Sequence, residues 1–201
     1  MASVGDLVRS VITAGGYPGL TALILLENIF PPVPSELVLP LAGYYVGEGE
    51  FNFLLAVAAA TAGSVIGAFV LYTIARRGGR ALLLRHGRVF RIKDSDLDRA
   101  DDWFDRYGGW LVLVGRLVPG VRSLVSVPAG VSEMPRVRFA LLTALGSAVW
   151  NAALVGLGVA LGRNYTEVAD FLGPVGTGIT VALILGGVAF AVWWFRRRSP
   201  A

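Results

Sequence analysis

Residues 27–36 read Glu-Asn-Ile-Phe-Pro-Pro-Val-Pro-Ser-Glu and separate two apolar stretches, 10–26 and 37–47, that are each shorter than a membrane-crossing helix needs. This break carries two glutamates and three prolines: Glu27, Glu36, Pro31, Pro32 and Pro34. Because proline interrupts helices and lipid cannot hydrogen-bond to the freed backbone, such a break must be buried in protein or line a cavity. The pattern predicts a re-entrant hairpin, with a kinked full span as the alternative. A true span at residues 10–26 stays open.

A second break of this kind lies at residues 115–122, which read Gly-Arg-Leu-Val-Pro-Gly-Val-Arg. Short apolar stretches flank it at 107–115 and 123–132, and its helix breakers and charges are Pro119, Gly120, Arg116 and Arg122. Aligned without gaps, residues 32–43 and 119–130 share five of twelve amino acids. The two breaks therefore predict a repeated unit, a re-entrant hairpin followed by one long span.

The composition is that of a membrane protein. Of the 201 residues, 55% are hydrophobic and only 16% are charged, whereas about 25% are charged in a typical soluble domain. This excludes an ordinary soluble protein, a disordered chain and a coiled coil. Three charge-free stretches are long enough to cross a bilayer: 51–75, 139–162 and 171–195.

Cysteine and histidine are too scarce for several kinds of site. The chain has no cysteine and one histidine, His86, which excludes disulfides, thiolate zinc sites and multi-histidine metal sites. We find no Ser-His-Asp set and no phosphate-binding glycine loop of the P-loop type. The sequence therefore predicts neither an enzyme, nor a metal site, nor a cofactor.

Basic residues are distributed unevenly around the predicted spans. If the second hairpin is re-entrant, fourteen of the eighteen lysines and arginines fall on one side: Arg76, Arg77, Arg80, Arg85, Arg88, Arg91, Lys93, Arg99, Arg106, Arg136, Arg138, Arg196, Arg197 and Arg198. The positive-inside rule makes that side cytoplasmic, together with the C-terminus. In so apolar a chain, the positive charge indicates orientation and not nucleic-acid binding. The two hairpins then enter from opposite sides, which is an inverted repeat of the kind found in transporters.

These observations predict an all-α integral membrane protein that forms a single membrane domain. The expected fold is an inverted repeat of a re-entrant helical hairpin plus a transmembrane helix, with an additional C-terminal transmembrane helix. The expected segments, in chain order, are an interfacial N-terminus (1–16), the first hairpin (17–47), a span (51–75), a basic loop that ends in an amphipathic helix at 94–107 (76–107), the second hairpin (108–132) and two further spans (139–162 and 171–195).

Four charged residues lie in or beside the two breaks: Glu27, Glu36, Arg116 and Arg122. A charge inside a membrane costs about 2.5–3.5 kcal/mol or more, so such residues face a cavity, pair with each other, or both. A guanidinium is a donor fork suited to phosphate, so Arg116 and Arg122 are expected to bind the phosphate of a substrate. Free N–H groups at a helix start after Gly120 would assist them. Glu27 and Glu36 are expected to carry protons, because a carboxyl group that alternates between apolar and cationic surroundings takes up and releases a proton. The alternative is a set of buried salt bridges between the hairpins.

These motifs resemble those of the DedA family, also called the SNARE-associated or VTT-domain family. Residues 27–36 are similar to its acidic, proline-rich signature and residues 115–122 to its arginine motif, and the resemblance covers roughly residues 16–162. Further matching positions are Gly130, Met134, Pro135, Phe139, Trp150, Asn151 and Gly158. The departures are small: Ser35-Glu36 stands where members often carry glycine with an acid, and Val159 stands where they carry tyrosine.

The resemblance implies paired re-entrant hairpins and lipid transport in a bacterial cytoplasmic membrane. Bacterial relatives are associated with returning undecaprenyl phosphate across that membrane, and others with flipping of phospholipid head groups or dependence on the proton motive force. The resemblance also implies that Glu27, Glu36, Arg116 and Arg122 form the functional set.

Three functions remain in competition at this point. The first is a flippase for a polyprenyl phosphate such as undecaprenyl phosphate, or for a phospholipid head group, coupled to protons or another cation. The second is an uncoupled phospholipid scramblase that uses the same cavity. The third is a non-transport membrane scaffold that binds lipid or a partner through the basic loop. The expected partners are a membrane lipid and a coupling ion, without nucleic acid, and a homo-oligomer is left open.

Overall fold

The fold is helical throughout the residues that the structure describes. The structure, a computed structural model, describes residues 4–29, 35–79, 94–119 and 121–164, and no strand occurs in these ranges. The prediction of an all-helical chain is confirmed for them. Some predicted features lie outside the described residues: Pro31, Pro32, Pro34, Gly120 and the span at 171–195.

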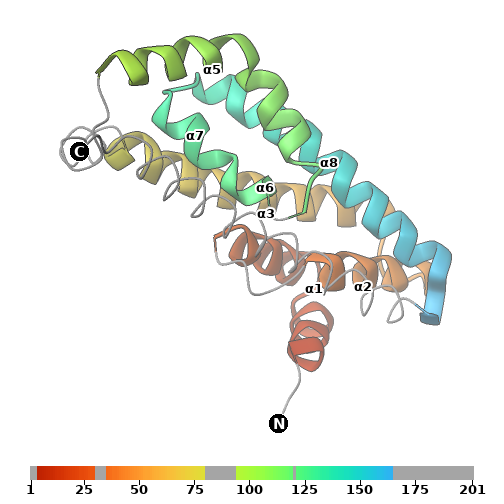
Figure 1. Cartoon of the computed structure of the whole chain (residues 1–201). Helices are drawn as coiled ribbons and strands as arrows, with labels where there is room; N and C mark the ends of the chain where they lie inside the picture. Colours follow the sequence, from red (N-terminus) through yellow and green to blue (C-terminus); the bar gives the residue numbers. More distant parts are fainter. Residues whose placement is uncertain (1–3, 30–34, 80–93, 120, 165–201) are drawn as a thin grey trace, which may run out of the picture.

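Two long helices, α3 and α8, pack against each other and organise the rest (Figure 1). The elements in chain order are α1 (Val4–Ile29), α2 (Ser35–Gly47), α3 (Phe53–Ile74), the π-helical turn η1 (Ala75–Gly79), α5 (Asp94–Gly115), α6 (Val121–Leu124), α7 (Ser126–Val131), α8 (Arg136–Leu161) and the 3-10 turn η2 (Gly162–Asn164). Helix α1 packs on α3, α2 and α5 pack on α8, and α7 packs on α3 and η1.

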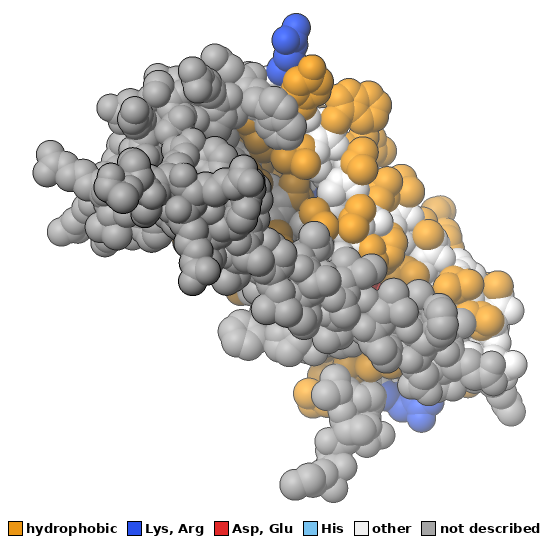
Figure 2. Space-filling view, in the orientation of Figure 1, with side chains coloured by type: hydrophobic (Ala, Val, Ile, Leu, Met, Phe, Trp, Pro, Cys, Tyr) orange, Lys and Arg blue, Asp and Glu red, His pale blue; other side chains and the backbone are white. Residues whose placement is uncertain are grey.

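Within the described part of the chain, three helices are long and apolar enough to cross a membrane: Leu7–Ile29, Phe53–Gly78 and Arg136–Leu161. The second and third correspond to the predicted spans at 51–75 and 139–162. Large apolar side chains such as Leu54 and Leu141 are exposed along them, and apolar side chains cover much of the described surface visible in Figure 2. Such a surface suits contact with lipid.

Helix α1 consists of two pieces joined at a kink. Gly16 has φ 54° and ψ −138°, outside the helical range, and Pro18 follows inside the helix. A left-handed φ of this kind is readily adopted only by glycine. The kink falls where the sequence analysis separates the N-terminal segment from the first hairpin.

Helix α5 runs without a break from Asp94 to Gly115. The sequence pattern predicts a division of this stretch at residue 107 into an amphipathic helix and the first arm of the second hairpin. No proline interrupts it, and Gly108 and Gly109 do not end it. The Phe104 ring occupies the space where a side chain at Gly108 would lie, and the Arg138 guanidinium occupies that space at Gly109. The predicted segment boundary therefore falls inside a helix.

The core consists of two apolar clusters with a buried polar layer between them. One cluster joins α1 and α2 with the first half of α3 and the second half of α8, and the other joins α5 and α7 with the opposite halves. On α3, the buried Ser64 lies between Ala60 of the first cluster and Ala68 of the second, and on α8 the buried Ser147 occupies the equivalent place. Both serines lie near the middle of a candidate span, so the polar layer crosses the candidate spans at their midpoints.

Candidate functional site

The C-terminal end of α1 carries two neighbouring buried polar residues that each bind one arginine of the second half. Glu27 is 6% exposed and Asn28 is 1% exposed. Glu27 forms an ion pair with Arg122, and Asn28 accepts a hydrogen bond from Arg116 Nη1 at 3.2 Å. The structure thus brings three of the four predicted charged residues to the end of one helix.

Arg122 links both arms of the first break. Its Nη2 atom is paired with Glu27 Oε1 and also donates to Ser35 Oγ at 2.6 Å. Glu27 ends the first arm and Ser35 begins α2, so a single guanidinium of the second break holds the chain on both sides of the first. The second carboxylate oxygen of Glu27 is buried and has no hydrogen-bond partner among the described residues.

Arg116 is buried more completely, at 1% exposure. Its guanidinium donates to Asn28 Oδ1 and, at 2.8 Å, to Ser126 Oγ of α7. No carboxylate among the described residues pairs with it, and its Nε is buried without a partner there. A buried guanidinium held only by neutral acceptors retains the capacity to bind an anion.

Glycines of the two long helices make room for these side chains. A Cβ at Gly146 of α8 would lie 2.8 Å from Arg116 Cβ, and a Cβ at Gly67 of α3 would lie 2.7 Å from Asn28 Cβ. Real Cβ atoms do not approach so closely, so any larger residue would displace Arg116 or its acceptor.

Glu36 lies in different surroundings from Glu27. It is buried at the start of α2, beside Ser35. No ion pair joins it to Arg116 or Arg122 within the described residues. The two glutamates therefore differ, because Glu27 is bound to the Arg122 guanidinium and Glu36 has no guanidinium partner in the described ranges.

At the expected helix start after Gly120, one backbone N–H group already has an acceptor in the preceding turn. Helix α6 has only four residues, and the backbone N–H of Arg122 donates to Val118 O at 3.2 Å. The turn at Pro119 keeps the chain folded tightly enough for this bond to form. The helix-terminus contribution stays a prediction, and the positive charge that the structure brings to the site is on the side chains of Arg116 and Arg122.

Sequence reasoning missed the neutral partners of the site and a polar stripe on α8. Thr143, Ser147 and Asn151 are buried and spaced four apart, so they share one face of the helix. Asn151 Nδ2 donates to Thr61 Oγ1 at 3.2 Å, while Asn151 Oδ1 and Thr143 Oγ1 have no partner in the described part of the chain. The spacing of these polar residues within an apolar span was the available signal.

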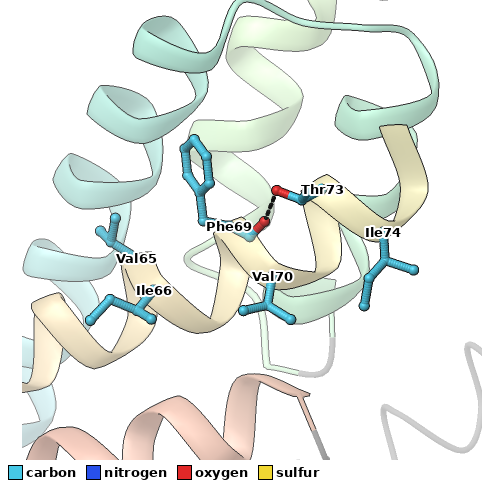
Figure 3. Close-up of a pocket in the computed structure, with 6 residues that line it drawn as sticks. All are labelled: Val65, Ile66, Phe69, Val70, Thr73 and Ile74. Carbon is cyan, nitrogen blue, oxygen red and sulfur yellow. Dashed lines mark hydrogen bonds between the residues drawn. The ribbon is translucent and has the colours of Figure 1, made fainter. Parts of the chain in front are cut away.

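The groove on the outer face of α3 is not a polar site (Figure 3). It measures about 540 Å³ and is lined by Val65, Ile66, Phe69, Val70, Thr73 and Ile74. Thr73 Oγ1 donates to Phe69 O at 2.7 Å, so the hydroxyl among the described lining residues is already satisfied. This face suits hydrocarbon and offers nothing to a phosphate.

The domain match decides the family. The VTT domain family matches residues 33–160, a range that contains α2, α3, α5 and all but the last residue of α8, together with Glu36, Arg116 and Arg122. This chain belongs to the VTT-domain (DedA) family. The resemblance noted in the two charged motifs is thereby confirmed. No solved structure matches the chain.

Two relatives of this VTT-domain protein are named as undecaprenyl phosphate transporters. It is 34% identical over 198 residues to undecaprenyl phosphate transporter A of Staphylococcus aureus, covering 96% of this chain and 98% of the relative. It is 34% identical over 201 residues to undecaprenyl phosphate transporter A of Bacillus subtilis, covering 98% of both. The apolar helices and these relatives identify a multi-pass bacterial membrane protein.

A third relative bears an enzyme-like name. The chain is 39% identical over 190 residues to an alkaline phosphatase-like protein of Lactococcus lactis subsp. cremoris, covering 92% of this chain and 87% of the relative. Within the described residues, no group of three or more His, Cys, Asp or Glu side chains could hold a metal ion. The transporter names favour a non-enzyme, and that name alone is weak support for an enzyme.

Proposed function

We propose that this VTT-domain protein moves a polyprenyl phosphate such as undecaprenyl phosphate, or a phospholipid head group, across the bacterial cytoplasmic membrane. The observation that carries the proposal is the meeting of Arg116 and Arg122 with the end of α1 in the polar layer at the midpoints of the candidate spans. A buried pair of guanidiniums at that depth suits a lipid phosphate. The transporter names of two relatives support the substrate class. The basic residues favour an orientation with the C-terminus in the cytoplasm.

Exchange of carboxylate for phosphate at Arg122 provides a transport step. An incoming phosphate competes with Glu27 for the guanidinium, because both are oxygen anions that accept its N–H groups. A displaced carboxylate in an apolar interior is unfavourable as an anion, so Glu27 takes up a proton as the phosphate binds. Arg116 completes the phosphate site, because its N–H groups are bound in this structure only to the neutral acceptors Asn28 and Ser126 among the described residues and can turn to the phosphate. Glu36 serves as a second carrier of protons, or of another coupling cation, at the start of α2.

The packing supports an inverted repeat of two re-entrant hairpins. The first arm of each hairpin packs on the long helix of its own half, α1 on α3 and α5 on α8, and the second arm crosses to the other half, α2 on α8 and α7 on α3. A Gly-Ser pair lies in the middle of each long helix. Gly63 approaches the backbone of α1 and Gly146 that of α5. A repeat of this kind lets one site open alternately to each side.

A direct test measures movement of a polyprenyl phosphate between the leaflets of proteoliposomes, read by the access of an external phosphatase to the head group. Arg116→Ala and Arg122→Ala are expected to slow movement at least about tenfold, because a charge-assisted hydrogen bond contributes about 1.5–3 kcal/mol. Arg136→Ala, at an exposed position of α8, is the matched control and should move lipid like the wild type. Wild-type rates in both arginine variants would show that these residues do not bind the phosphate.

An uncoupled phospholipid scramblase is the second candidate, favoured by the neutral acceptors around Arg116. An imposed pH gradient separates the two. Coupled transport predicts a net flux that follows the gradient in the wild type and responds more weakly to it in Glu27→Gln, which keeps only Glu36 as a proton carrier. A wild-type flux that ignores the gradient favours the scramblase.

A further inference from the structure

A second cationic site lies at the surface, where α5 meets α8. The groove there measures about 280 Å³ and is lined by Arg106, Gly109, Trp110, Leu113, Arg138 and Leu142. Both arginines are exposed, and Trp110 is 69% exposed. None of these side chains belongs to the buried site at the end of α1.

The groove changes from cationic to apolar along its length. Gly109 lies beside the Arg138 guanidinium, whose Nη2 atom is 2.9 Å from the Cβ position of the glycine. Farther along both helices, the Cβ position of Gly146 is 3.0 Å from Leu113 O. The two helices therefore run in the same direction here, which places the arginines at one end of the groove and Leu113 and Leu142 at the other.

This gradient coincides with the expected edge of the membrane. Arg138 is the third residue of the candidate span Arg136–Leu161, and Val137 and Leu141 beside it are exposed. A tryptophan and arginines at the end of an apolar span are typical of the boundary between lipid and water. The cationic end of the groove therefore lies at head-group level and its leucine end at the level of the acyl chains.

We propose that this groove binds the phosphate head group of an anionic phospholipid from the adjoining leaflet. Among the side chains that the structure describes, no carboxylate forms an ion pair with Arg106 or Arg138, so both guanidiniums are available to a phosphate. Gly109 permits this arrangement, since a side chain there would push Arg138 away from α5. Trp110 lies beside the glycerol region. Because the groove is open whereas Arg116 and Arg122 are buried, the bulk lipid of the leaflet is the occupant that reaches it.

Retention of phosphatidylglycerol by the purified full-length protein, measured by native mass spectrometry in neutral detergent, tests the proposal. Arg106→Ala with Arg138→Ala is expected to weaken phosphatidylglycerol binding about 25-fold, since each interfacial arginine contributes about fivefold. Phosphatidylcholine is the neutral probe, and its weak binding should not change. The double variant Arg77→Ala with Arg136→Ala removes the same charge from exposed positions outside the groove and should retain phosphatidylglycerol.

Gly109→Ala separates geometry from charge. It keeps every arginine but displaces the Arg138 guanidinium, so it should also weaken phosphatidylglycerol binding, with an unchanged helical circular dichroism spectrum. If the two double variants lose phosphatidylglycerol binding to the same extent, the lipid binds to positive charge in general and not to this groove, and the proposal is overturned. Unchanged binding in the groove variant would also overturn it, as would a polyprenyl phosphate that displaces phosphatidylglycerol from this groove. None of these readouts depends on transport, so failure here is distinguishable from failure of the proposed function.

Discussion

The fit between α5 and α8 at Gly146 predicts a large effect from a single methyl group. In Gly146→Ala the new Cβ would lie 2.8 Å from Arg116 Cβ and 3.0 Å from Leu113 O. The helix backbone or the buried arginine must move, and overpacking of this kind costs about 1–3 kcal/mol. The better helix propensity of alanine offsets about 0.5–1 kcal/mol of that cost. We therefore expect a net loss of stability together with displacement of Arg116 from Asn28 and Ser126.

Gly156→Ala is the matched control for this variant. It makes the same change on the same helix, but the nearest atom to its Cβ is Phe53 Cε2 at 3.9 Å, an ordinary contact. The assay is unfolding in mixed detergent and SDS micelles, followed by circular dichroism, alongside lipid movement in proteoliposomes. Gly146→Ala should unfold more easily and transport more slowly than the wild type, whereas Gly156→Ala should match the wild type or exceed its stability. Indistinguishable unfolding of the two variants would refute the close packing at Arg116.

Three further effects follow from other contacts in the structure. Glu27→Gln alone should reduce the free energy of unfolding more than the same change made together with Arg122→Met, because removing one partner strands a buried charge at a cost of about 3–5 kcal/mol; additive losses in the unfolding titration would contradict the ion pair. Gly43→Ala should destabilise the protein, because its Cβ would collide with the backbone of α8, whereas Gly47→Ala finds its nearest atom at 3.8 Å and should be tolerated; equal thermal stability of the two would refute that crossing. Tyr72→Phe removes a buried hydroxyl that donates to Met134 O and should lower the free energy of unfolding by about 1 kcal/mol; an unchanged value would show that this bond contributes nothing.

The positions of the charged breaks could be predicted from the sequence because lipid imposes strict rules on charge and proline. Glu27, Arg116 and Arg122 stand out in apolar surroundings, and the structure brings them to one helix end. The two described long spans follow from uninterrupted hydrophobicity at 51–75 and 139–162.

The neutral partners could not be predicted in the same way. Asn28, Ser35 and Ser126 acquire their role only when the second half packs across the first, and each is an ordinary residue in its own segment. The continuity of α5 could not be predicted from the sequence for a related reason. The change from polar to apolar sequence near residue 107 reflects a change of surroundings along one helix, and a change of surroundings does not end a helix unless a breaker accompanies it.

The proposed function requires that charges from both halves meet inside the membrane at a site for a lipid phosphate. Its most direct test is the identity of the lipid that co-purifies with the protein, determined by mass spectrometry. Apart from the phospholipid held in the α5–α8 groove, we expect a phosphorylated lipid that is retained by the wild type and by Arg77→Ala with Arg136→Ala, and is lost from Arg116→Ala with Arg122→Ala. The same lipid, in the same amount, on the Arg116 and Arg122 double variant would contradict it.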